Sequence, residues 1–162
     1  MSGLSIRRLR PGELELVEPL WNALREHHAG VAPDLGATRE RATSWELRRA
    51  QYERWLAEPD SFLLLAERAG EPVGYAMVHL HDGSPTWPSE RSGELETLSV
   101  LPGERGQGTG ATLLEAVREQ LRLLGADELS VFVISTNADA IRFYERHLFA
   151  ASGVWLRTGL TP

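Results

Sequence analysis

Two carboxylates past the middle of the chain are the first residues with a clear capacity for chemistry. Glu94 and Glu96 are separated by one residue, in a segment that alternates polar and apolar side chains. Such alternation is typical of a β-strand, and it predicts that both carboxylates share a face with Leu98 and Val100. A carboxylate that is partly removed from water can accept a proton from a reacting group. The alternative is that both are ordinary solvent-facing carboxylates at a sheet edge.

A glycine-rich loop follows this predicted strand. Residues 103–110 contain four glycines, and apolar residues then recur at helical spacing until Gly125. The first turn of a helix leaves its N–H groups unpaired and carries about half a positive charge. Bare glycine backbone there lets phosphate oxygens approach the amides, so the loop predicts a phosphate site. The alternative is a plain turn in which glycine only relieves backbone strain.

Two common phosphate-binding motifs do not fit this loop. A P-loop needs a lysine directly after its second glycine, but Thr109 follows Gly108 and the chain contains no lysine. A dinucleotide fingerprint needs the spacing Gly-x-Gly-x-x-Gly, whereas Gly106, Gly108 and Gly110 are spaced as Gly-x-Gly-x-Gly. The loop therefore matches neither of these motifs, and the ligand that carries its phosphate must be inferred from another pattern.

Two segments together resemble a known family. Arg105-x-x-Gly108-x-Gly110 is similar to the acetyl-CoA signature Gln/Arg-x-x-Gly-x-Gly/Ala of the GNAT N-acetyltransferase superfamily. Asn137 to Arg146 resembles the Asn-x-x-Ala-x-x-Phe-Tyr-Glu run of the same superfamily. The specific resemblance covers roughly residues 94–149. It departs from the family where Leu148 precedes Phe149 in place of the usual glycine, which puts the last strands and the acceptor site in question.

The order of predicted elements agrees with the GNAT fold, an α/β fold with a central mixed β-sheet flanked by helices. We expect one domain over residues 1–162 with the order βααβββαβαβ(β), the second helix being capped by Ser44. The expected strands are 4–9, 61–68, 72–81, 94–101, 128–135 and one or two within 149–158. The expected helices are 13–28, 44–57, a helix from the glycine loop to Leu124, and 138–147.

The resemblance implies the following cofactor contacts. The loop amides would hold the pyrophosphate of acetyl-CoA, and the main chain of Leu98 and Val100 would pair with the pantetheine arm. Asn137 would touch that arm, although it also suits the role of helix N-cap. The loop positions that carry over from the family are Arg105, Gly106, Gln107, Gly108, Thr109 and Gly110.

The resemblance also implies catalytic roles. Tyr144 would lie beside the CoA sulfur and donate a proton to the departing thiolate, although it also fits a core aromatic on an apolar helical face. Glu96, with Glu94 as the alternative, would take the proton of the amine. The chain has no cysteine, so no cysteine-bound acyl-enzyme can form and the amine would attack the thioester directly.

Composition restricts the remaining choices. The net charge of −6 disfavours nucleic-acid binding, and no apolar run is long enough for a membrane span. We expect a cytoplasmic protein. His79 and His81 lack a third partner at a recognised metal spacing, so no metal site is expected. We expect His27 and His28 to be surface residues at a helix end, with a place in the wall of the acceptor site as the alternative. Trp87 is a candidate for that wall.

The sequence therefore predicts an N-acetyltransferase that moves an acetyl group from acetyl-CoA to a primary amine in a ternary complex. The alternative is a noncatalytic acyl-CoA-binding or regulatory module of the same fold. Small amines, aminoglycosides, amino acids, peptides and protein lysines all stay open as acceptors. Homodimers are common in the family, so a homodimer is an option, although no stretch of this sequence identifies an interface.

Overall fold

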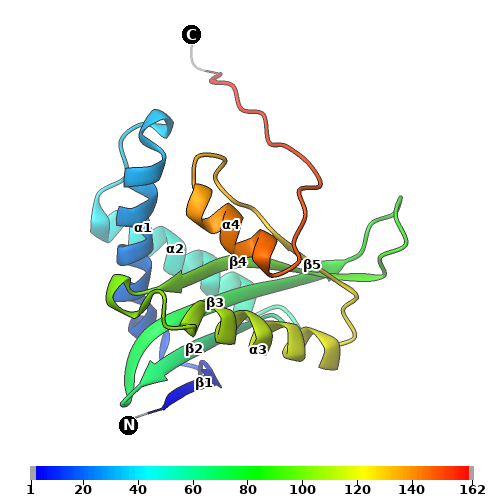
Figure 1. The fold of residues 1–162 in the computed structure, drawn as a ribbon, viewed down its shortest axis with the longest axis horizontal. Helices are drawn as coiled ribbons and strands as arrows, with labels where there is room; N and C mark the ends of the chain where they lie inside the picture. Colours follow the sequence, from blue (N-terminus) through cyan, green and yellow to red (C-terminus); the bar gives the residue numbers. More distant parts are fainter. Residues whose placement is uncertain (1–2, 161–162) are drawn as a thin grey trace.

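A computed structural model describes residues 3–160 and shows a five-stranded mixed sheet with helices on both faces (Figure 1). The strands lie side by side in chain order. Neighbouring strands are antiparallel except β4 and β5, which are parallel. The strands are β1 (Leu4–Arg8), β2 (Phe62–Arg68), β3 (Glu71–Asp82), β4 (Arg91–Val100) and β5 (Glu128–Val131). The predicted α/β architecture is confirmed.

Two helices cover each face of the sheet. The first pair is α1 (Glu18–Val31) and α2 (Arg41–Leu56), and the second is α3 (Thr109–Leu123) and α4 (Ala138–Arg146). Short 3₁₀ turns lie at Leu14–Val17, Pro33–Leu35 and Pro102–Glu104. No helix in the described range 3–160 is both long and apolar enough to cross a membrane.

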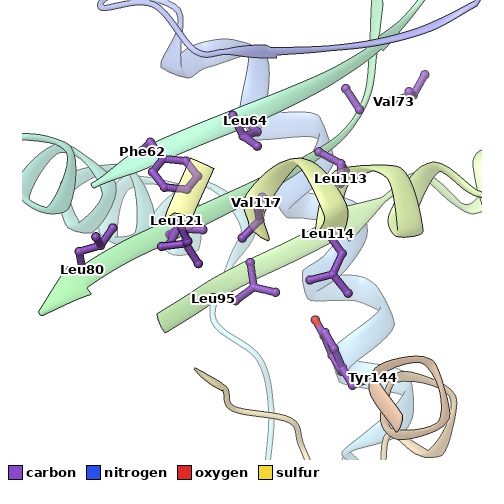
Figure 2. Close-up of a cluster of buried hydrophobic side chains, with 13 residues drawn as sticks. Phe62, Leu64, Val73, Leu80, Leu95, Leu113, Leu114, Val117, Leu121 and Tyr144 are labelled. Carbon is purple, nitrogen blue, oxygen red and sulfur yellow. The ribbon is translucent and has the colours of Figure 1, made fainter. Parts of the chain in front are cut away.

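A separate apolar core fills each side of the sheet. Figure 2 shows the core under α3, where Leu113, Val117 and Leu121 recur at helical spacing and meet side chains of β2, β3 and β4. The opposite core packs Tyr52 of α2 against the sheet, and its hydroxyl is hydrogen bonded to Thr97 of β4 at 2.6 Å. Strand β4 is therefore held from both faces, which fixes the backbone that carries Glu94 and Glu96.

Helix α2 begins earlier than the sequence predicted. Glu40 caps it, because the carboxylate of Glu40 accepts a hydrogen bond from the amide of Thr43 at 3.1 Å. The prediction of Ser44 as the cap is wrong. Ser44 lies inside the helix, and its hydroxyl accepts a hydrogen bond from the indole of Trp21 at 3.3 Å. This contact joins α2 to α1.

A β-bulge at Glu96 interrupts the alternation of β4. Thr97 lies opposite Met77 and Leu95 opposite Val78, so Glu96 is the extra residue. The expectation that the two glutamates share a face with Leu98 and Val100 is wrong. Leu95, Leu98 and Val100 all join the core under α3. Glu94 lies opposite His79, whose ring stacks on Trp55 of α2, so Glu94 belongs to the other face.

The closing strands expected within 149–158 are absent, since no residue from 149 to 160 lies in a strand, and β5 ends at Val131. Figure 1 shows this segment leaving the body of the protein. Its apolar residues are exposed, Trp155 at 77%. Apolar character alone does not provide a partner strand, and this segment has none among the described residues.

Leu148 takes over the backbone role of the family glycine. It ends α4 with a φ of 67°, in the left-handed region where glycine costs least. A side chain there costs about 1–2 kcal/mol. The turn still delivers Phe149 to the core, where its ring meets that of Tyr144 with 5.2 Å between centroids. The departure from the family pattern therefore leaves the end of α4 intact.

Candidate active site

A cavity of about 850 Å³ opens where β4 and β5 separate. The two strands pair only as far as Leu95 and Val131, so β4 has no partner on that side from Glu96 onward. The N–H and C=O groups on that side can therefore pair with a ligand. The cavity is lined by β4, the glycine loop, residues 131–134, α3 and α4, and on another side by α1 and α2.

Nearly all of the site residues predicted from the sequence line this one cavity. They are Glu94, Glu96, Leu98, Val100, Arg105, Gly106, Gly108, Thr109, Gly110, Asn137 and Tyr144. Gln107 does not line it. Its side-chain amide donates to the carbonyl of Gly103 at 2.8 Å, which closes the loop on itself. Gln107 therefore shapes the loop rather than facing the cavity.

The loop at one end of the cavity presents backbone groups. Gly106 and Gly108 have φ values of 73° and 82°, which favour glycine. Gly108 is the N-cap of α3 and supplies no side-chain acceptor, so the first amides of α3 have no cap. Arg105 donates through Nε to the carbonyl of Val100 at 3.1 Å and ties the loop to β4. Free amides and the positive end of α3 suit a phosphate.

Side chains near this loop add to its suitability for a phosphate. The hydroxyl of Thr109 is buried and has no hydrogen-bond partner among residues 3–160. Arg146 of α4 lines the same cavity and brings positive charge, whereas Arg142 lines it while paired with Asp139, which offsets its charge. We refer to this part of the cavity, with residues 98–110, as the cofactor end.

Asn137 is the N-cap of α4. Its Oδ1 accepts a hydrogen bond from the amide of Ala140 at 3.3 Å, and its side chain is buried at the cavity wall. The capping role is therefore confirmed. A contact with the cofactor arm stays a prediction.

Tyr144 combines a core position with access to the cavity. Only 9% of its surface is exposed, and its ring packs edge-on against Phe143 and Phe149. Figure 2 shows the ring reaching from α4 toward β4 with the hydroxyl oxygen at its leading end. Burial raises the pKa of Tyr144 above its ordinary value. The phenol is thus protonated at neutral pH, as a hydrogen-bond donor must be.

The two glutamates lie in a different environment, which we call the acceptor end. Its residues are Glu94 and Glu96 of β4, Leu24, His27 and His28 of α1, and Arg48 of α2. Burial, and then the negative charge of Glu94, raises the pKa of Glu96, whereas His79 and Arg48 oppose the rise. A raised pKa makes Glu96 a better proton acceptor than an exposed carboxylate.

His79 connects Glu96 to the surface. Its Nδ1 lies 3.8 Å from Oε1 of Glu96, and its Nε2 lies 2.5 Å from Oε2 of Glu58. The indole of Trp55 stacks on the imidazole with 5.7 Å between ring centroids. The spacing of His79 and His81 suggested only a metal ligand as a function for His79. Its place beside Glu96 depends on strand pairing, which the sequence does not reveal.

Arg48 was not among the site residues predicted from the sequence, and Trp87 does not lie where it was expected. Arg48 is one of several arginines on α2, and nothing in its spacing distinguishes it. His28 lines the cavity, which was the alternative considered for it from the sequence. Burial lowers the pKa of His28, which favours the neutral ring. Trp87 is 71% exposed on the loop between β3 and β4 and is not among the lining residues. Its expected role as an acceptor-site wall is wrong.

Comparisons with known proteins agree with this geometry. The family model described as acetyltransferase (GNAT) family matches residues 21–149, most of the chain. The chain therefore belongs to the GNAT acetyltransferase family.

Curated relatives include two proteins named mycothiol acetyltransferase. The one from Thermobispora bispora is 34% identical over 143 residues, covering 88% of this chain and 45% of the relative. The one from Cellulomonas flavigena is 30% identical over 163 residues, covering 99% of this chain and 44% of the relative. The chain thus spans less than half the length of these relatives.

Solved structures share the fold at low sequence identity. A tetramutant of the BH1408 protein from Bacillus halodurans has a TM-score of 0.81 at 20% identity, covering 96% of this chain and 99% of that chain. The aminoglycoside N-acetyltransferase AAC(6')-Iy in complex with CoA has a TM-score of 0.75 at 20% identity, covering 99% of this chain and 97% of that chain.

Proposed function

We propose that this chain is an acetyl-CoA-dependent N-acetyltransferase that acetylates a primary amine within a ternary complex. The observation that carries the proposal is that one cavity joins a glycine loop suited to a pyrophosphate to a pair of half-buried carboxylates suited to an amine. One domain supplies both ends. Membership of the GNAT family supports acetyl-CoA as the acyl donor.

In the proposed complex, the pyrophosphate of acetyl-CoA binds the amides of Gly106 to Gly110 at the positive end of α3. The pantetheine arm lies along β4 and pairs with the main chain of Leu98 and Val100, where β5 leaves the edge of β4 free. Asn137 supports the arm from the start of α4. These contacts place the thioester between Tyr144 and Glu96.

The chemical step needs a neutral amine. An alkylamine with a pKa of about 10.4 is only about one part in 10³ neutral at pH 7, so a base must remove its proton. Glu96 is the proposed base, directly or through water, and Glu94 is the alternative. The amine nitrogen then forms its bond to the acetyl carbon and loses its second proton as the C–S bond breaks. Tyr144 donates its hydrogen bond or proton to the departing thiolate, and the second proton of the amine replaces any proton that the thiolate takes.

His79 is proposed as a positioning residue for Glu96. It is held by Glu58 on one side and by Trp55 on its face. Its charge, when present, also lowers the pKa of Glu96 and so opposes the effect of burial. Proton release from Glu96 to solvent can pass by the imidazole of His79, because an imidazole ring can accept a proton on one nitrogen and donate one from the other.

A noncatalytic acyl-CoA-binding module is the rival function. It would keep the cofactor end and lack turnover. The raised pKa of Glu96 favours the enzyme, because it gives a cavity carboxylate the properties of a base. Release of CoA from acetyl-CoA, measured over a panel of amines, tests the proposal. Calorimetric binding of acetyl-CoA without turnover of any amine would support the rival.

A cytoplasmic location and a homodimer are also proposed. Acetyl-CoA as the donor supports the location, and fractionation of the native host tests it. The exposed side chains of Val154, Trp155 and Leu156, and separately the position of β5 at the end of the strand order, support an interface between two copies. Light scattering after size-exclusion chromatography would show a mass of two chains, and a single-chain mass at high concentration would contradict the dimer.

A further inference from the structure

Arg48 is a charged side chain at the acceptor end that contacts two aromatic rings and no hydrogen-bond acceptor among residues 3–160. Its guanidinium carbon lies 4.4 Å from the centre of the Trp21 ring and 5.4 Å from that of Tyr52. The two rings hold the guanidinium by cation–π contacts. Within the range 3–160 it forms no ion pair or hydrogen bond, although it lines the cavity.

The next arginine on the same helix shows the contrast. Arg49 pairs with Glu15 and, at 3.0 Å through Nε, with Glu53, and it does not line the cavity. Successive residues of a helix point about 100° apart, so the two guanidinium groups serve different surroundings. The charge of Arg49 is paired with two carboxylates, whereas the five N–H donors of Arg48 have no acceptor among residues 3–160.

The charge of Arg48 acts on the same space as the proposed base. It lowers the pKa of Glu96, behind the larger effects of burial, Glu94 and His79, and it lowers that of His28, behind burial and His27. His28 is disfavoured as a second cation, because burial favours its neutral form. The acceptor end thus holds carboxylates on β4 and a guanidinium on α2, and both line the same cavity.

We propose that Arg48 binds a carboxylate of the acceptor, so that the preferred acceptors are small zwitterionic amines, of which amino acids are the simplest members. This inference rests on the proposed function and specifies the substrate class of the same site. A guanidinium matches a carboxylate in bidentate geometry, which lysine or histidine would not reproduce. Glu96 and Glu94 meet the ammonium group while Arg48 meets the carboxylate.

A polycationic acceptor fits this arrangement less well. It would place an ammonium group near a guanidinium that is partly shielded from water, and like charges at short range repel. The aminoglycoside acetyltransferases among the structural neighbours share the fold at low identity, so they do not decide the acceptor. The position of Arg48 therefore predicts a preference for acceptors that carry a carboxylate.

The test compares matched pairs of acceptors that differ only in the carboxylate. Lysine with cadaverine and phenylalanine with phenethylamine are suitable pairs. We expect wild-type kcat/KM to be about 10- to 100-fold higher for the amino acids, as for the loss of one charged hydrogen-bonded contact. Arg48→Gln should remove that preference, mainly through KM, and change the decarboxylated amines by less than about threefold. Arg48→Lys should restore only part of it.

Two controls separate this role from a structural one. Arg49→Gln should leave the preference for amino acids unchanged, and thermal melting should show that the Arg48 and Arg49 variants fold. Calorimetric titration of the same acceptor pairs into the CoA-saturated protein gives a readout without turnover. Amino acids that bind through Arg48 but are not acetylated would contradict the proposed function and leave this inference standing.

Three results would overturn the inference. The first is an equal or better kcat/KM for the decarboxylated or polycationic amines. The second is an Arg48→Gln variant that weakens both members of each pair to the same extent, which would make Arg48 a clamp between α1 and α2. The third is the absence of any carboxylate-dependent binding or turnover in the wild-type protein.

Discussion

The cofactor end and the acceptor end of the cavity are built in different ways. The cofactor end is mostly backbone: left-handed glycines, uncapped amides of α3 and an unpaired edge of β4, all within residues 98–110. The acceptor end is made of side chains from α1, α2 and β4, which lie far apart in the chain. Backbone recognises what every acyl-CoA shares, whereas side chains can differ from one acetyltransferase to the next. The cofactor end therefore supports the assignment to a family, whereas the acceptor end carries the information about the substrate.

The strongest test of this division is Glu96→Gln at the acceptor end. Loss of a general base should lower kcat/KM by roughly 10²- to 10³-fold at pH 7. The loss should shrink toward pH 9–10, where more of the amine is already neutral. Acetyl-CoA affinity, measured by calorimetry, should stay within a few-fold of the wild type. A pH profile parallel to that of the wild type would assign Glu96 to substrate positioning instead.

Tyr144→Phe probes the place where the two ends meet. Phenylalanine keeps the ring packing against Phe143 and Phe149 and removes only the hydroxyl. We expect kcat to fall by roughly 10²-fold, because the leaving thiolate loses its hydrogen-bond donor, with little change in melting temperature. An acyl donor with a more acidic thiol as leaving group should narrow the difference. Wild-type turnover in the variant would confine Tyr144 to core packing.

The cofactor end is tested by Gly108→Val. A β-branched residue at a φ of 82° is strained, and its methyl groups would lie where phosphate oxygens approach the amides. We expect acetyl-CoA affinity to fall by about 10- to 100-fold, with the relative preference among amines unchanged.

Gly110→Ala is the matched control for this prediction. Its φ is not in the left-handed region, and the added Cβ would meet the ring of Phe143 at 3.5 Å, an ordinary contact. Its affinity for acetyl-CoA should stay close to that of the wild type. A Gly108→Val protein that folds and binds acetyl-CoA normally would mean that the loop does not hold the pyrophosphate.

The same difference between the two ends explains how much could be predicted from the sequence. The glycine loop, α3 and the Asn137 cap depend on neighbours within a few residues, so their patterns could be read directly and are confirmed. The bulge at Glu96 depends on pairing with β3, and the sequence alternation concealed it.

Most of the incorrect predictions also concern contacts between segments that are distant in the chain. The expected closing strands over 149–158 had the right composition and no partner strand, and Ser44 was a suitable cap for a helix that begins earlier at Glu40. Arg48 enters the site because α2 packs next to Trp21 of α1, and residue spacing carries no record of that packing. Tertiary contacts between distant segments thus decided the closing segment and Arg48, whereas the cap at Glu40 is a local contact with Thr43, three residues along the chain.

The smallest expected effect is a pair of opposite shifts in the acid limb of the pH profile of kcat/KM, which follows the ionisation of the base in the free enzyme. The charge of Glu94 raises the pKa of Glu96, and that of His79 lowers it. Glu94→Gln should therefore move the acid limb to lower pH, because a like charge is lost. His79→Asn should move it to higher pH, because a neighbour that favours the carboxylate is lost.

Glu58→Gln should act in the same direction as His79→Asn but less strongly, since Glu58 reaches Glu96 only through the imidazole. Rates at the pH optimum should change by only a few-fold in all three. Shifts in one common direction, or a limb unmoved by Glu94→Gln, would show that the limb reports on a group other than Glu96.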